Sequence, residues 1–258
     1  MSDQPVLCQR DGHRVLVTLN RPEQRNALDQ SIIDGLHAIM DDLWDDPEVG
    51  ALILTGAGDK AFAAGADIGQ LRERRRVEAL MAINSRMFQR MEEAPFPTIA
   101  AIQGWCLGGG CELAMACDIR IAGEGARFGQ PEVGLGIIPG AGATYRLPLL
   151  VGTGKAKELI FSGRIIDAAE AKTLGLVNEV VPDAEILDAA ERMASDILKQ
   201  DRLAVRLAKS LMRLDGGHRP GVGLLVEPIV QGILFESEEK MRRMGEFLER
   251  RNKKKDKR

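Results

Sequence analysis

Two glutamates stand out because each interrupts a segment that is otherwise apolar and rich in glycine. Glu112 follows three consecutive glycines, 108 to 110, in GWCLGGGCELAMACD. Glu132 lies in FGQPEVGLGIIPGAG, a second loop of small and apolar residues. Burying a carboxylate is costly unless it is paired or functional. Each glutamate alone could be a capping residue, but two of them beside a glycine loop favour acid–base catalysis.

The three glycines occur where a strand should give way to a helix. The apolar run TIAAIQG precedes them, and residues 111 to 117 contain no helix breaker. Glycines at such a junction expose backbone N–H groups at the positive end of the new helix. Tight packing of helix on strand is the alternative, and it explains one glycine more easily than three.

A second loop of small residues, AFAAGADI at 61 to 68, follows another apolar run. If the two loops lie side by side, the N–H groups of Ala66 and Gly109 could converge on one carbonyl oxygen. Small side chains would then be required, because the ligand must approach the backbone within hydrogen-bond distance. The pattern predicts an oxyanion site next to the glutamates.

The elements that must position these groups alternate between strand and helix. Asp29 is a plausible N-cap for a helix with apolar residues at the helical period. Strands are predicted at 13–20, 51–56, 98–104 and 118–122, and a further helix at 71–91. Strand, helix and strand in this rhythm indicate parallel crossovers, so the predicted class is α/β.

The pattern becomes mostly helical from Gly140 onward. Helices are predicted at 142–151, 153–162, 167–174, 184–199, 201–213 and 222–251, with one strand in LVNEVVP. We therefore expect a core over residues 1–200 and a helical carboxy-terminal region over 201–258. The last nine residues contain seven Lys or Arg, a run typical of a solvated tail.

Other site classes find little support. The glycines from 134 to 140 do not fit a dinucleotide fingerprint, VGTGKAKE is not a phosphate-binding loop, and no GxSxG segment occurs. The four cysteines form no CxxC pair, and the three histidines stand apart, so we expect no metal site. A net charge of -3 does not predict strong attraction to nucleic acid.

No apolar run approaches the roughly 20 residues of a membrane span. The first twelve residues have neither a secretory apolar core nor an Arg-rich transit pattern. A cytoplasmic protein without a membrane segment is expected.

The ordered motifs AFAAGAD, GGGCELAMACD, FGQPEVGLGIIPGAG and FSGRIIDAAEAKTLGLVNEVV resemble the crotonase superfamily, specifically its enoyl-CoA hydratases. The resemblance extends over nearly the whole chain. It implies a spiral of ββα units with a helical carboxy-terminal trimerisation region, and a homotrimer or homohexamer. The implied substrate is an acyl-CoA, with coenzyme A as part of the substrate and no separate cofactor.

The resemblance also implies roles for individual residues. Glu112 and Glu132 would activate water for addition across the 2,3 double bond of a trans-2-enoyl-CoA, with the thioester oxygen held by the Ala66 and Gly109 N–H groups. The backbone of Gly140 would position the water. The residues implied to bind the substrate are Ala64, Asp67, Ile68 and Gly108, with Phe247 and Arg250 from a neighbouring subunit.

Departures from the family pattern concern the periphery of this site. Gly69 stands where many hydratases have Lys, and Arg242 and Arg243 stand where many have Glu-Gly. The retention of both glutamates favours hydration over double-bond isomerisation or thioester hydrolysis. RNA binding through the RERRR cluster at 72–76 and the basic tail is the alternative from a different class, and nucleic acid is not the expected partner.

Overall fold

The computed structural model describes residues 4–73, 75–215 and 220–255. By its internal contacts the chain divides into two units, Met1–Asp196 and Ile197–Arg258. The boundary falls within the last helix of the first unit, close to the boundary expected from sequence.

The first unit contains two sheets. The larger has the strand order β1-β2-β3-β5-β7-β10 and the smaller β4-β6-β8-β9. All neighbours pair in parallel except β1 with β2 and β8 with β9. The strands are β1 Val6–Asp11, β2 Arg14–Leu19, β3 Ala51–Gly56, β4 Ala61–Ala63, β5 Thr98–Ile102, β6 Trp105–Leu107, β7 Ile119–Gly123, β8 Arg127–Gly129, β9 Ile166–Asp167 and β10 Glu179–Val181.

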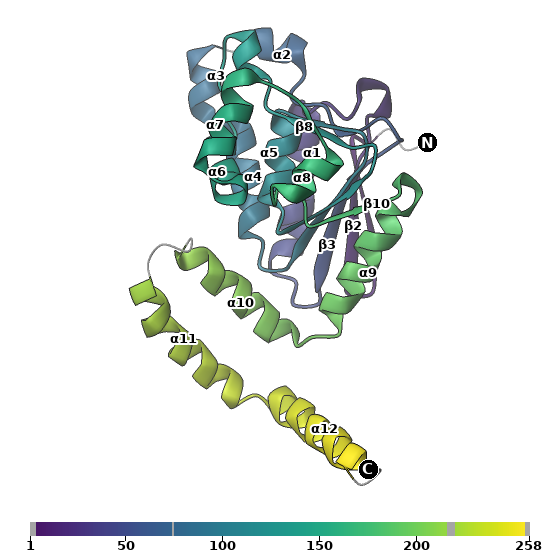
Figure 1. The fold of residues 1–258 in the computed structure, drawn as a ribbon, viewed down its shortest axis with the longest axis vertical. Coiled ribbons are helices and arrows are strands. Elements are labelled where there is room, and N and C mark those ends of the chain that lie inside the picture. Colours follow the sequence, from purple (N-terminus) through teal and green to yellow (C-terminus); the bar gives the residue numbers. More distant parts are fainter. Residues whose placement is uncertain (1–3, 74, 216–219, 256–258) are drawn as a thin grey trace. The chain divides into compact units, whose positions relative to one another are not determined.

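The two strands of each successive pair belong to different sheets. β3, β5 and β7 belong to the larger sheet, and the strand after each one, β4, β6 or β8, belongs to the smaller. Helical segments follow each pair, so the chain winds as a spiral of ββα units (Figure 1). The spiral and the α/β class expected from the resemblance are confirmed.

The helices complete both units. They are α1 Gln30–Trp44, α2 Ile68–Glu73, α3 Arg76–Met81, α4 Ile83–Glu93, α5 Gly109–Ala116, α6 Ala143–Val151, α7 Thr153–Ser162, α8 Ala168–Thr173, α9 Ile186–Leu198, α10 Arg202–Asp215, α11 Pro220–Phe235 and α12 Glu238–Lys255. Short 3₁₀ turns are η1 Pro22–Gln24, η2 Glu132–Leu135 and η3 Asp183–Glu185. Within the described residues, every helix is too short or too polar to cross a membrane.

Two of the predicted helices are wrong in extent. The segment 71–91 is divided among α2, α3 and α4, and Ala82, at the start of α4, has φ 51° in the left-handed region. The segment 222–251 is divided between α11 and α12, because the Ser237 hydroxyl accepts a hydrogen bond from the Lys240 N–H and caps α12. Such a serine is an ordinary helix start signal.

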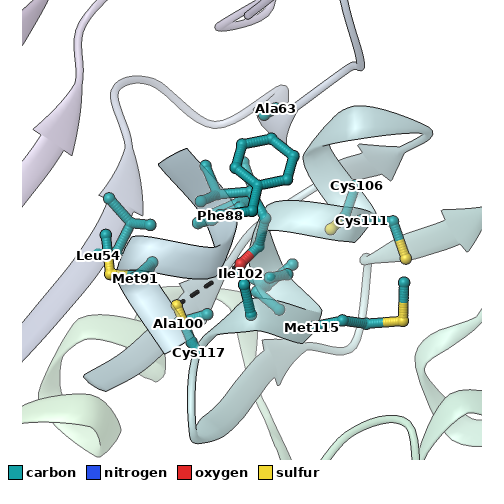
Figure 2. Packing of buried hydrophobic residues seen from close by; sticks show 14 of the residues in the cluster. Leu54, Ala63, Phe88, Met91, Ala100, Ile102, Cys106, Cys111, Met115 and Cys117 are labelled. Carbon is teal, nitrogen blue, oxygen red and sulfur yellow. Dashed lines mark hydrogen bonds between the residues drawn. The ribbon is translucent and has the colours of Figure 1, made fainter. Parts of the chain in front are cut away.

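The core of the first unit lies where α4 and α5 pack on the sheets. β5 is buried along its whole length, which explains why it reads as a continuous apolar run. Phe88 and Met91 of α4 lie in one buried cluster with Leu54 of β3 and Ala63 of β4 (Figure 2). Cys106, Cys111 and Cys117 are buried in the same core. This packing fixes the position of α5, the helix that carries Glu112.

Candidate active site

The glycine loop forms the junction between β6 and α5. Gly108 is the N-cap of α5, with φ 50°, and its N–H donates to the Gly129 carbonyl of β8 at 2.9 Å. A Cβ added to Gly110 would overlap the carbonyl oxygen of Ala63 in β4. The glycines therefore let the helix begin directly against the small sheet.

The two predicted oxyanion residues are neighbours. A Cβ built on Gly109 would lie 3.7 Å from the Ala66 nitrogen, and one built on Gly65 would lie 4.0 Å from the Gly109 nitrogen. Gly109 is the first residue of α5, where an N–H has no partner within the helix. The two loops therefore lie side by side, as the oxyanion prediction requires.

The segment 25–28 holds β4 and the loop that carries Ala66. The buried side-chain amide of Asn26 donates to the carbonyls of Ala57, at 3.0 Å, and Ala61, at 2.8 Å. Next to it, the Arg25 carbonyl accepts from the Ala64 N–H at 3.0 Å, and the Gly65 carbonyl accepts from Leu28. The sequence interpretation missed Asn26, although an amide in the turn-rich segment NRPEQRNA was the available signal.

A cavity of about 610 Å³ joins these groups. Its lining contains seven predicted site residues, which are Ala64, Ala66, Gly108, Gly109, Glu112, Glu132 and Gly140. Much of the remaining wall is apolar, with Leu71, Ile83, Leu107, Leu135, Ile137 and Ile138. Among the described residues, no group of three or more His, Cys, Asp or Glu could hold a metal ion.

The other four predicted site residues are not seen in this lining. Asp67 is absent from the described cavity lining, and its carboxylate accepts from the Gln70 N–H at 2.9 Å in the first turn of α2. The side chains of Ile68, Phe247 and Arg250 lie outside the described residues. Their predicted contact with substrate remains a prediction.

Glu112 is almost completely buried, with 2% of its surface exposed. Its Oε1 accepts the N–H of Ala141 at 2.7 Å and the N–H of Ala143 at 2.9 Å. Burial raises the pKa of Glu112, while these donors and the nearby positive charge of Arg146 oppose the rise. The carboxylate is therefore oriented by backbone and supported in its ionised form.

Glu132 occupies a more open position on η2. Burial, together with the negative charge of Glu112, raises its pKa to about 7. With its amide nitrogen facing the carboxylate, buried Gln130 donates to Oε1 at 3.2 Å and Oε2 at 3.3 Å. A Cβ added to Gly108 would lie 2.8 Å from Oε1, so Glu132 faces the glycine loop directly. Near neutral pH this carboxyl can hold a proton and release it.

The cavity thus combines a pair of backbone donors with two carboxyl groups in unlike environments. Such a site can stabilise negative charge on a carbonyl oxygen while one carboxylate takes a proton and the other gives one. These are the requirements for reactions that pass through an enolate.

Comparisons with known proteins show the family to which the chain belongs. The enoyl-CoA hydratase/isomerase family model matches residues 12–257, and the chain belongs to that family. The short-chain-enoyl-CoA hydratase of Clostridium acetobutylicum is 42% identical over 248 residues, covering 95% of each chain. The crotonyl-CoA hydratase of Syntrophomonas wolfei is 40% identical over 253 residues, covering 97% of each.

Solved structures show the same fold. The crystal structure of an enoyl-CoA hydratase from Bacillus anthracis has a TM-score of 0.92 with this chain at 38% sequence identity. The match covers 96% of this chain and 97% of that one. The resemblance drawn from the motifs is therefore confirmed along both sequence and structure.

Proposed function

We propose that this enoyl-CoA hydratase adds water reversibly across the 2,3 double bond of a trans-2-enoyl-CoA, with Glu112 and Glu132 as its acid–base pair. The activity rests on the family and on relatives named as hydratases. The observation that supports the catalytic roles is the presence of both carboxyl groups in one cavity with Ala66 and Gly109.

In the proposed mechanism the thioester oxygen accepts hydrogen bonds from the Ala66 and Gly109 N–H groups. This polarises the conjugated system and makes carbon 3 electrophilic. Water attacks carbon 3 as Glu112 takes one of its protons, and the electron pair of the double bond moves to form an enolate. Glu132 then delivers its proton to carbon 2, and the product is a 3-hydroxyacyl-CoA.

The preformed donors favour the transition state more than the substrate. Negative charge develops on the thioester oxygen during attack, and fixed N–H dipoles stabilise it without reorganising. The backbone of Gly140, which lines the same cavity, would help to position the water. Coenzyme A enters as part of the substrate, and no separate cofactor takes part in this scheme.

We further propose a short acyl chain, because the relatives from Clostridium and Syntrophomonas are named for short-chain and crotonyl substrates.

We also propose a homotrimer or homohexamer, which the helical unit supports. It exposes apolar side chains at Leu203, Ile229, Ile233 and Phe235, a surface suited to contact with other subunits. We place the enzyme in the cytoplasm.

A panel of trans-2-enoyl-CoA substrates from four to sixteen carbons tests this function. The measured quantities are kcat/KM for loss of the conjugated thioester and the mass of the product. We expect the highest kcat/KM at four carbons and a product heavier by one water. Migration of the double bond without water uptake would instead identify an isomerase.

Light scattering tests the proposed trimer or hexamer, and a monomer at micromolar concentration would contradict it.

A further inference from the structure

The donors to Glu112 come from one short turn, residues 140–143, which leads into the first residue of α6. The N–H groups of Ala141 and Ala143 both end on the same carboxylate oxygen. Any shift of this turn therefore moves the carboxylate or removes its hydrogen bonds. The position of Glu112 therefore depends on the contacts that hold the turn.

Helix α4 holds the turn at two points. The Ser85 hydroxyl, near the start of α4, donates to the Gly140 carbonyl at 2.7 Å. At the other end of the helix, Glu92 accepts from Arg146 at 3.1 Å through Nε and 2.6 Å through Nη2. Arg146 in turn donates through Nη1 to the Ala141 carbonyl at 3.0 Å. The same residue, Ala141, thus donates to Glu112 and accepts from Arg146.

The surroundings of Arg146 are specific to its guanidinium. Arg146 is only 3% exposed, although a buried charge is costly unless it is paired. The Tyr145 ring lies 4.8 Å from the guanidinium carbon. A Cβ on Gly142 would overlap Nη1, and Gly142 has φ 122°, so glycine at this position leaves room for the side chain. The turn and the arginine fit together as one unit.

We propose that Arg146 is a positioning residue for Glu112, holding the 140–143 turn so that its N–H groups orient the carboxylate for water activation. This inference rests on the proposed function. Glu92 anchors the guanidinium on α4, and a planar side chain with several donors can bond Glu92 and the Ala141 carbonyl at once. A lysine ammonium at the end of a flexible chain cannot donate to both acceptors in this fixed geometry.

The charge of Arg146 adds an electrostatic effect to the geometric one. Among the described residues, the charged groups that act on Glu112 are Arg146 from α6 and Glu132 from η2, and Glu92 from α4 pairs with Arg146. Arg146 lowers the pKa of Glu112 against the effect of burial. Removing the positive charge should therefore raise that pKa, and the carboxylate would become protonated at a higher pH.

The test compares Arg146→Met, Arg146→Lys and Glu92→Gln with the wild type. The control is Arg90→Met. Arg90 is also paired with a carboxylate, that of Asp41 at 2.6 Å, but it has no described contact with the 140–143 turn. The readouts are kcat and KM for crotonyl-CoA, the pH profile of kcat/KM, and the Glu112 carboxyl resonance in ¹³C-labelled enzyme, assigned with Glu112→Gln. The resonance reports the ionisation of Glu112 whether or not the enzyme hydrates this substrate.

For Arg146→Lys we expect kcat to fall about tenfold or more with KM little changed, since a misplaced catalytic group lowers turnover more than binding. Its acidic limb should stay near that of the wild type because the positive charge remains. In Arg146→Met, kcat should fall at least as far, and both the acidic limb and the titration of Glu112 should move to higher pH. Glu92→Gln should show a smaller loss of kcat, and Arg90→Met the wild-type profile.

The proposal fails if the pKa of Glu112 is the same in Arg146→Met as in the wild type. It also fails if Arg146→Lys and Glu92→Gln both keep wild-type kcat. The last two variants decide the matter even if Arg146→Met does not fold. Absence of hydration by the wild type would refute the proposed function instead. The titration of Glu112 would still show whether Arg146 acts on that carboxylate.

Discussion

The two carboxyl groups of the cavity are held by regions of contrasting construction. Glu112 lies on a helix in the core, buried, with two backbone donors on one oxygen. Glu132 lies on a 3₁₀ turn beside Val133, which is 36% exposed, and Leu135, which is 58% exposed. Identical side chains thus lie in a buried site with two backbone donors in one region and, in the other, in a half-open site where the side chain of Gln130 is the donor.

The contrast teaches how one residue type can supply both a base and an acid. Donors to an ionised carboxylate favour its charged form, whereas burial without such donors favours the neutral form. Burial raises both pKa values, but the backbone N–H groups and Arg146 counter it at Glu112. At Glu132 the charge of Glu112 adds to the rise. Environments that push two carboxyl pKa values apart are the usual basis for assigning acid and base.

The largest effect should come from breaking the buried region at Gly110. An added methyl group in Gly110→Ala would overlap the Ala63 carbonyl and push α5 away from β4. Because this displaces the Gly109 N–H and Glu112 together, we expect kcat/KM for crotonyl-CoA to fall by at least ~10²-fold. Circular dichroism would establish that the variant folds. A folded variant with wild-type kinetics would show that the glycine junction does not set the site geometry.

The pH profile sharpens the contrast between acid and base. In hydration Glu132 must be protonated, and its pKa is about 7. Hydration kcat/KM should therefore fall about tenfold per pH unit above about 7. The overall reaction neither takes up nor releases a proton, so kcat/KM for dehydration of the 3-hydroxyacyl-CoA must follow the same pH profile. A hydration kcat/KM that stays constant between pH 7 and pH 9 would contradict the assignment of Glu132 as the acid.

The smallest effect concerns stability. A carboxyl whose pKa is higher folded than unfolded stabilises the fold fully below the unfolded value, near 4.5, and this contribution is lost as pH rises through about 7. Glu132→Gln carries no charge to desolvate, so it should unfold at a higher temperature than the wild type at pH 8 and not at pH 4.5. After discounting for partial exposure, the gain is about 1 kcal/mol, or about 2–4 °C in Tm.

The matched control for this comparison is Glu158→Gln. Hydrogen bonds from Lys155 and Arg164 lower the pKa of exposed Glu158, so its replacement should give no gain at pH 8. Thermal unfolding of all three proteins at equal concentration checks both signs. A Glu132→Gln variant less stable than wild type at pH 8 would mean that Glu132 is held ionised.

Sequence patterns predicted the long elements of the core well. The runs behind β3, β5 and β7 are apolar because these strands are buried in the larger sheet, and the short helix after the glycines is α5. The same patterns found both glutamates, since a carboxylate in an apolar segment is conspicuous. They also found the loops of Ala66 and Gly109, because close approach of a ligand to backbone requires small residues.

Other features left no readable local signal. The strands β4, β6 and β8 span three residues each, too few for a period of two to show. Their pairing into a second sheet is a long-range property, and the spiral was expected only from the resemblance. Like Asn26, Gln130 and Arg146 were missed although each has a usable signal, because each is a polar side chain within an apolar run. Their roles depend on partners far away in sequence, such as Glu92 on α4.

A double-mutant cycle on the two glutamates tests the central claim most directly. Glu112→Gln and Glu132→Gln preserve shape and hydrogen bonding but cannot exchange a proton at neutral pH. Each should lower kcat for crotonyl-CoA hydration by at least ~10²-fold with the fold intact. The double variant should lose far less than the product of the two single losses, because both groups serve one reaction as a unit. Near-normal hydration by Glu112→Gln, or losses that simply multiply, would contradict the account.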